Sequence, residues 1–313
     1  MEKQLAVSTN PKDSLLEPLL IAYTSYIRKY PDDDLTPVYL YKVGSIYVRM
    51  QNWKEATKHF EFIIDRYKDS PVYSEAIILA AAAYETVRGN NEERAAALYK
   101  LYLEKFPKGK SKERAEFYFK PEDVKMRARI AAYQDELFKD NSNKGLSRQT
   151  AHMLERQYLN YIKRFPKSEF TPNYCFEGGK LASTLGETPD AVEFWLSIID
   201  NYPDYRLYPE TMLLLAVEYE NKMPIYIQNP PKKEKRTAKL QLKVERFDLM
   251  KTDWLKEAEK MYNAFLAKYP NHALSEQARA SLKYLGKSPN EVVSGFKNEL
   301  DKLRGLDKKM SNN

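Results

Sequence analysis

The sequence predicts an all-α protein, a right-handed α-solenoid of about thirteen helices in helix-turn-helix repeats with two insertions. Three observations predict this fold. An aromatic residue followed by proline recurs along the chain, apolar residues at helical spacing precede each copy, and a small residue follows several copies at a fixed distance. Only 10 of the 313 residues are glycine, which disfavours a turn-rich β architecture and Gly-rich phosphate loops.

The recurring aromatic residue marks the end of one helix in each repeat. It occurs in Tyr30-Pro31, Phe106-Pro107, Phe165-Pro166, Tyr202-Pro203 and Tyr269-Pro270, and Tyr67 is a sixth copy without the proline. Successive copies are separated by 37, 39, 59, 37 and 67 residues. Three intervals therefore share one period, and the other two contain insertions of about 20 and about 30 residues.

The residues before each of these anchor residues form one stripe of a helix. Seven positions upstream, every copy has an aromatic residue: Tyr23, Phe60, Tyr99, Tyr158, Trp195 and Tyr262. The positions four and eleven upstream are also apolar. Apolar residues at offsets of 0, 4, 7 and 11 lie on one face of an α-helix, and the proline then stops that helix.

A second helix begins downstream of the anchor. Pro37, Pro172 and Pro209 each lie seven residues after their anchor, a position that suits the first helical turn. A small residue follows fourteen positions after four anchors: Gly44, Ala81, Gly179 and Ala216. A small residue lets two helices approach closely. Each repeat is therefore a helix pair whose apolar faces need neighbouring pairs.

This pattern resembles the tetratricopeptide repeat. The residues that match its signature positions in order are Leu40, Val43, Gly44, Tyr47, Ala56, Phe60 and Ile63, and the resemblance covers about residues 14–285. Each repeat is about three residues longer than the 34-residue norm of the family, and the extra residues lie in the turn between repeats. Long turns of this type look like those of tetratricopeptide lipoproteins in bacterial envelopes. That narrower resemblance implies a periplasmic protein whose native precursor receives a lipid that anchors it to the outer membrane.

The predicted organisation has five segments. Residues 1–110 and 148–220 are repeats, 111–147 is a helical insertion, 221–251 is a basic insertion with the start of a long helix, and 252–313 holds a repeat and capping helices. In the first insertion, Pro121 is expected to open a helix whose apolar face is Val124, Ala128, Ala131 and Phe138. In the second, an apolar stripe continues without a break, which predicts one helix over 237–268.

The formal net charge of +7 is concentrated in residues 232–251, which supply +5 of it. We expect an accessory basic surface made of Lys232, Lys233, Lys235, Arg236, Lys239 and Lys243. A solvated helix face, a partner surface and an anionic membrane surface all fit this charge. The remaining charge is nearly balanced, which argues against specific nucleic-acid binding.

Neither catalysis nor metal binding is predicted. The three histidines, His59, His152 and His272, lie in separate repeats and are expected on helix surfaces, and Cys175 falls on a core position. We therefore predict no catalytic residue, no metal site and no cofactor. No apolar run is long enough to span a membrane. The first residues lack a hydrophobic signal segment, which leaves open a cytoplasmic protein or a processed envelope protein.

Protein binding is the predicted function. In tetratricopeptide arrays the first helix of each repeat lines a groove, and the resemblance places Tyr41, Ser45, Ile78, Phe176, Lys180 and Leu213 along it. An apolar, partly aromatic column suits a peptide segment of a partner. The predicted protein is a scaffold or subunit of a multiprotein assembly in the bacterial envelope. The alternatives are a cytoplasmic adaptor that captures peptide segments and, third, a helical toroid hydrolase.

Overall fold

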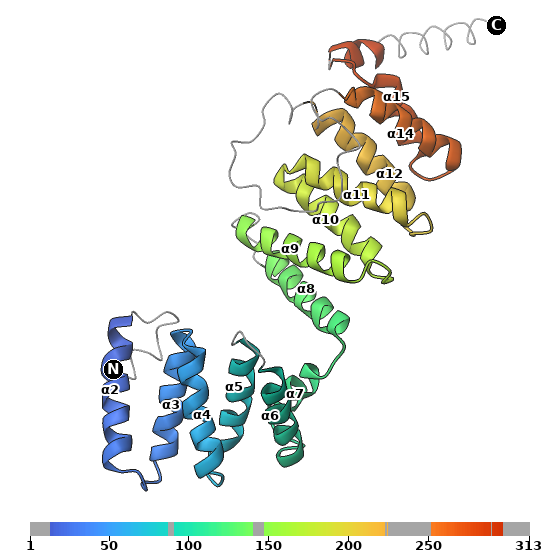
Figure 1. Ribbon diagram of the computed structural model, residues 1–313. Coiled ribbons are helices and arrows are strands. Elements are labelled where there is room, and N and C mark those ends of the chain that lie inside the picture. The colour runs from blue at the N-terminus through green and yellow to red at the C-terminus, as the bar shows by residue number, and fades with distance from the viewer. Residues whose placement is uncertain are drawn as a thin grey trace, which may run out of the picture. The chain divides into compact units, whose positions relative to one another are not determined.

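The computed structural model describes residues 13–86, 91–139, 147–222, 224, 252–288 and 290–296. Within these residues the chain forms fourteen helical elements and no strand, so the predicted helical solenoid fold is confirmed (Figure 1). The chain divides into two compact units, one up to Lys125 and one from Met126 onward. Each unit is a stack of its own.

The first unit contains six complete helices. These are α2 (Asp13–Lys29), α3 (Thr36–Arg49), α4 (Trp53–Arg66), α5 (Tyr73–Thr86), α6 (Glu92–Lys105) and α7 (Lys112–Tyr118). Each helix packs against the next one along the chain. Pairs such as α3 with α4 and α5 with α6 are the predicted repeats, and the short helix α7 packs on α6.

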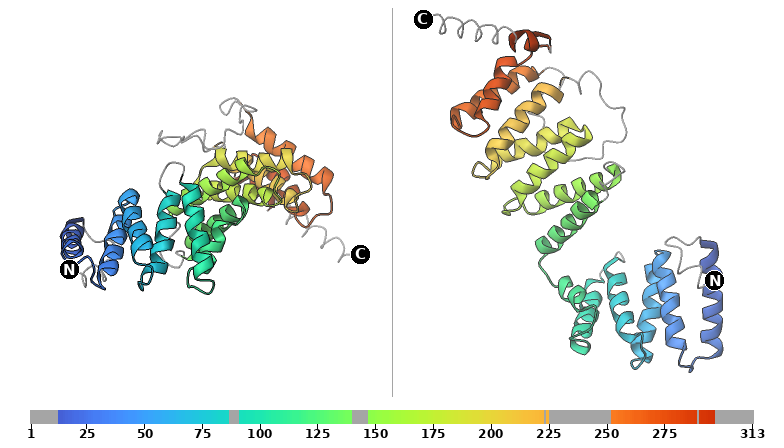
Figure 2. Two further views of the ribbon diagram at one scale, coloured as in Figure 1. Left: turned by 60° about the horizontal axis from the view of Figure 1, so that its bottom comes forward. Right: turned by 180° about the vertical axis from the view of Figure 1, so that it is seen from behind.

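The second unit begins within α8 (Glu122–Lys139) and repeats the same scheme. Its other helices are α9 (Arg148–Arg164), α10 (Thr171–Leu185), α11 (Thr188–Asn201), α12 (Tyr208–Val217), η2 (Glu218–Lys222), α14 (Trp254–Lys268) and α15 (Ser275–Tyr284). From α9 to α15 each helix lies beside the one before it in every view (Figures 1 and 2). Residues 290–296, which are not counted among the fourteen elements, add about two further helical turns after α15.

The predicted apolar stripes form the cores of both units. Tyr99 and Trp195 are each 1% exposed, and Phe60 is fully buried. Close approach between paired helices depends on the predicted glycines. A Cβ atom added at Gly44 would lie 2.6 Å from the Phe60 ring, and one at Gly179 would collide with the indole of Trp195. The same sequence spacing therefore gives the same packing in both units.

The connections that follow the anchor residues all have the same length. They span residues 30–35, 67–72, 106–111, 165–170, 202–207 and 269–274, which is six residues each time. In each one the anchor carbonyl accepts a hydrogen bond from the amide three residues later. The carbonyl of that residue then accepts from the amide three residues further on. The extra length relative to the 34-residue repeat is thus built as two consecutive turns.

Side chains reinforce several of these connections. Thr36 and Thr171 each donate a 2.5 Å hydrogen bond to the carbonyl of the anchor six residues earlier. Between repeats, Tyr67 donates to the Pro31 carbonyl over 2.9 Å, and Tyr202 donates to the Pro166 carbonyl over 2.6 Å. Each of these tyrosine hydrogen bonds spans 36 residues of sequence, so it joins one connection to the next.

The helix in the first insertion buries a different face from the one predicted. Ala128 and Ala131 are exposed, whereas Met126, Ile130 and Leu137 are buried in the core of the second unit. The prediction was wrong because the face of α8 that carries Met126, Ile130 and Leu137 joins the same core as the buried residues of α9. Two side-chain hydrogen bonds also join α8 to α9: Gln134 donates to the Tyr158 hydroxyl over 2.9 Å, and Thr150 donates to Glu136.

The predicted continuous helix over 237–268 is also corrected. Helix α14 begins at Trp254, and residues 252 and 253 are not helical. The Asp253 side chain accepts a hydrogen bond from the Lys256 amide, so Asp253 is the N-cap that starts the helix. The predicted earlier part of the helix and the basic surface Lys232, Lys233, Lys235, Arg236, Lys239 and Lys243 lie outside the described residues.

Candidate partner-binding surface

The predicted groove residues of the first unit lie on the first helices of two repeats. Tyr41 on α3 is half-buried, and its ring lies 6.0 Å from the Phe60 ring. Burial raises the pKa of the Tyr41 hydroxyl, so this side chain stays neutral at physiological pH. Ser45 donates a hydrogen bond to the Tyr41 carbonyl over 2.8 Å. Ile78 on α5 is only 6% exposed.

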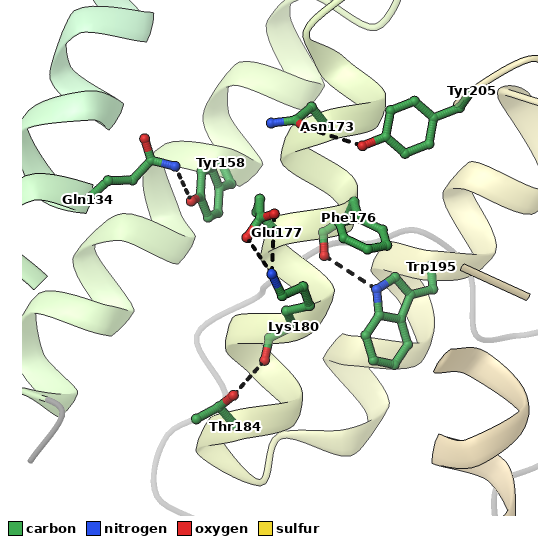
Figure 3. Close-up of polar contacts among 9 residues, drawn as sticks. All are labelled: Gln134, Tyr158, Asn173, Phe176, Glu177, Lys180, Thr184, Trp195 and Tyr205. Carbon is green, nitrogen blue, oxygen red and sulfur yellow. Dashed lines mark hydrogen bonds and ion pairs between the residues drawn. The ribbon is translucent and has the colours of Figure 1, made fainter. Parts of the chain in front are cut away.

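Two of the predicted groove residues of the second unit, Phe176 and Lys180, lie on α10 (Figure 3). The Phe176 ring is 8% exposed and lies 6.2 Å from the ring of Tyr205. The Phe176 carbonyl accepts a hydrogen bond from the Trp195 indole nitrogen, 3.4 Å away. Leu213 on α12 is 6% exposed. Both apolar residues therefore pack mainly against their own unit.

Lys180 gives this surface its exposed charge. Its side chain is half exposed, and its ammonium group lies 3.2 Å from a Glu177 carboxylate oxygen. The same ammonium group lies 5.6 Å from the centre of the Phe176 ring, which is within cation–π range. The Thr184 hydroxyl donates to the Lys180 carbonyl one turn along the helix. An exposed ion pair of this kind contributes little to stability, so its charges remain available to a partner.

The burial of the column changes what each predicted residue can contribute. Ile78, Phe176 and Leu213 offer little surface, whereas Tyr41 and Lys180 offer the most. Tyr41 and Phe176 occupy equivalent positions, eleven residues after their anchors, and both are aromatic. Their contact with a partner is untested and stays a prediction. Sequence periodicity gives these residues equivalent positions in their repeats, but it does not tell how deeply each side chain lies between neighbouring helices.

A polar network that the sequence did not predict closes the end of α12. Here the π-helix η2 buries the Glu218 carboxylate, which accepts a 2.9 Å hydrogen bond from Ser183. Lys222 donates to the Ser183 carbonyl over 2.9 Å and lies 3.7 Å from Glu218. Burial raises the pKa of Glu218, although Ser183 and Lys222 oppose that shift. The network holds the C-terminal ends of α10 and α12 together before the second insertion.

Cys175 lies in the core of the second unit, as its position in the repeat predicts. The residue is fully buried, and its sulfur lies 3.8 Å from the Ser197 hydroxyl. Burial raises the pKa of the thiol to about 12, because a thiolate cannot be solvated there. A cysteine in this state is a packing residue and a poor nucleophile.

The three histidines have different surroundings. His59 stacks on Tyr47 at 5.5 Å, and burial lowers its pKa. The His272 ring accepts a hydrogen bond from the Leu274 amide. His152, expected as an isolated surface residue, instead lies between the carboxylates of Glu155 and Glu187. The spacing of His152 and Glu155, three residues apart on one helix face, was the signal that sequence inspection missed.

The comparisons with known proteins support the repeat assignment. The family model described as tetratricopeptide repeat matches residues 39–70, which cover most of α3, all of α4 and the first part of the connection after α4. No curated protein matches the chain. Within the part of the chain that the structure describes, no helix combines the length and the apolar character needed to cross a membrane. The match, together with the repeated helix pairs, supports a tetratricopeptide-repeat protein.

Proposed function

We propose that this chain is a non-catalytic scaffold or subunit of a multiprotein assembly that binds partner proteins through the first helices of its repeats. Tetratricopeptide repeats generally mediate protein–protein interaction. The observation that carries the proposal is the stacking of equivalent helix pairs, since stacked repeats present a row of first helices as one extended surface.

The contact residues that we propose differ between the two units. In the first unit the half-buried Tyr41 supplies an aromatic surface with a neutral hydroxyl group. In the second unit Lys180 and Glu177 supply a pair of opposite charges beside the Phe176 ring. A segment that combines an apolar side chain with a charged one fits such a surface, because the apolar contact gives affinity and the charge fixes orientation.

A capture experiment tests this surface. The double variant Tyr41→Ala, Lys180→Glu removes the aromatic ring from one unit and reverses the charge in the other. The matched control is Phe62→Ala, Lys163→Glu, which makes the same kinds of change at exposed positions of second helices, α4 and α9. Partners captured by the native chain from its own cells are quantified by mass spectrometry.

We expect the first variant to lose its main partner and the control to keep it. Both variants must retain the native far-UV circular dichroism spectrum and melting temperature. Equal capture by the two variants would show that the first helices are not the binding surface. The alternative function is an adaptor that captures peptide segments. In that case a short peptide from the partner should compete with the whole partner for binding to this chain.

The proposed compartment is the bacterial envelope, with the cytoplasm as the alternative. The proposal is supported by the long turns between repeats, which resemble those of tetratricopeptide lipoproteins. Cell fractionation of the native gene product, followed by a test for a covalently attached lipid, distinguishes the two compartments. A product found only in the cytoplasmic fraction would exclude the envelope.

The accessory basic surface, Lys232, Lys233, Lys235, Arg236, Lys239 and Lys243, is proposed to add an electrostatic contact with an acidic partner or an anionic surface. Its attraction should weaken with salt, because the screening length falls from about 10 Å at 0.1 M to about 3 Å at 1 M. Replacing all six residues with glutamine should reduce both partner affinity and its salt dependence. Unchanged binding at every salt concentration would leave this segment without a role in recognition.

A further inference from the structure

We infer that the second unit contains a binding site for a divalent zinc-type cation, formed by His152, Glu155 and Glu187. The site would join α9 to the connection between α10 and α11. His152 and Glu155 lie one turn apart on α9, and Glu187 is the residue that precedes α11. One potential ligand atom from each residue lies within 4.8 Å of those from the other two.

The distances around His152 fit a shared ion better than direct hydrogen bonds. Its Nδ1 atom lies 3.6 Å from a Glu155 oxygen and 3.7 Å from a Glu187 oxygen. A direct N–H···O bond would measure about 2.7–3.2 Å. Zinc bonds of about 2.0–2.2 Å at a tetrahedral angle place two ligand atoms about 3.3–3.5 Å apart. Small rotations of His152 and Glu187, which are both partly exposed, close the remaining gap.

The burial of the ligand atoms is a second, independent observation. The Nδ1 atom of His152 is shielded from solvent and has no hydrogen-bond partner, although the side chain as a whole is 38% exposed. A buried polar atom of this kind is uncommon and needs an explanation. The Glu155 side chain is only 1% exposed, so its carboxylate is held in place beside His152.

The donor set indicates the class of ion. One imidazole nitrogen and two carboxylate oxygens are ligands that zinc accepts, whereas calcium and magnesium prefer oxygen alone. Three protein ligands leave one coordination position, and the partly exposed His152 and Glu187 leave it open to water. Because the ligands come from α9 and from the start of α11, the bound ion would restrain both sides of α10.

Calorimetric titration of the full chain with zinc chloride tests the inference. The chain must carry no histidine tag, because a tag would itself bind zinc. Metal already bound must first be removed with a chelator, because it would hide the binding of added zinc. We expect one bound ion per chain. His152→Gln and Glu187→Gln should each weaken binding at least about 100-fold, which exceeds the loss typical of changing an outer-shell partner. Both positions are partly exposed, so these variants should remain folded.

The other two histidines provide matched controls. His59→Gln and His272→Gln change the same residue type elsewhere in the chain and should bind zinc as the native chain does. Cobalt bound at the site should show the visible absorption of a four-coordinate ion, and His152→Gln should abolish it. If the native chain binds no zinc, or if His152→Gln binds it as tightly as the native chain, the cluster is an ion pair of a protonated histidine and the inference is wrong.

Discussion

Replacing Trp195 with alanine tests the packing that defines the repeat. The indole is 1% exposed and lies against Gly179 on the neighbouring helix. A buried aromatic side chain removes about 150–250 Å² from water. At about 25 cal/mol per Å² this is about 4–6 kcal/mol. Alanine retains a small part of that burial, so the expected loss is about 3–5 kcal/mol, the range measured for such truncations.

The hydrogen bond that Trp195 donates adds little to this loss. At 3.4 Å to the Phe176 carbonyl it is long, so its contribution lies near the lower end of about 0.5–1.5 kcal/mol. Trp195→Phe is the matched control, because Phe60 occupies the equivalent position opposite Gly44 in the first unit. This variant keeps the ring contact with the glycine and should lose only about 1–2 kcal/mol.

Urea denaturation followed by far-UV circular dichroism measures both losses. Because the chain has two compact units, hydrogen exchange in α10 and α11 should be measured in parallel to assign the change to the second unit. A loss below about 1 kcal/mol for Trp195→Ala would show that the indole does not fill the seam between these helices. Equal losses for alanine and phenylalanine would show that ring contact with Gly179 is not the source of the stability.

Three further predictions concern the connections, the buried carboxylate and the corrected helix start. Tyr67→Phe and Tyr202→Phe should each cost about 0.5–1 kcal/mol by urea denaturation, because each removes one exposed hydrogen bond between connections; no loss in either would make these bonds incidental. The raised pKa of Glu218 means that the folded state binds its proton more tightly, so this group's contribution to stability should fall as pH rises above 4.5. Glu218→Gln should flatten that fall in melting temperature, and an unchanged pH profile would contradict the assignment. Asp253→Ala should cost about 0.5–2 kcal/mol as the loss of an N-cap, whereas a helix that continued upstream of Trp254 would be insensitive to it.

The helix pairs could be predicted from the sequence because the same pattern is repeated six times. An aromatic residue seven positions before each anchor is a local signal, and each copy confirms the others. The face of α8 could not be read as securely, because that helix lies outside the repeated pattern. Met126, Ile130 and Leu137 do follow the offsets of the other stripes, but the alanines on the opposite face gave a competing stripe.

The start of α14 shows a different limit. An apolar stripe records which residues would share a face if the segment were helical, and it carries no information about where the helix begins. Asp253 sets the start of the helix, because its side chain accepts a hydrogen bond from the Lys256 amide. The apolar stripe before Asp253 therefore does not belong to α14. The cluster of His152 with Glu187 was equally hidden, because its members are brought together by the packing of α9 against the α10–α11 connection.

The six connections of equal length have a consequence for how such a chain can change. Between α3 and α4, and between α10 and α11, the link is only a few residues long, whereas between η2 and α14 it runs over 223–253. These links join the two helices inside a pair, at the end away from the anchor residues. The length of the connections is therefore constant at the edge of each stack that carries the anchor residues, whereas the length of the links varies at the opposite, free edge. New sequence, whether acquired in evolution or added by an experimenter as a label, a tag or a binding loop, belongs at the free edge, where it leaves the spacing between successive pairs unchanged.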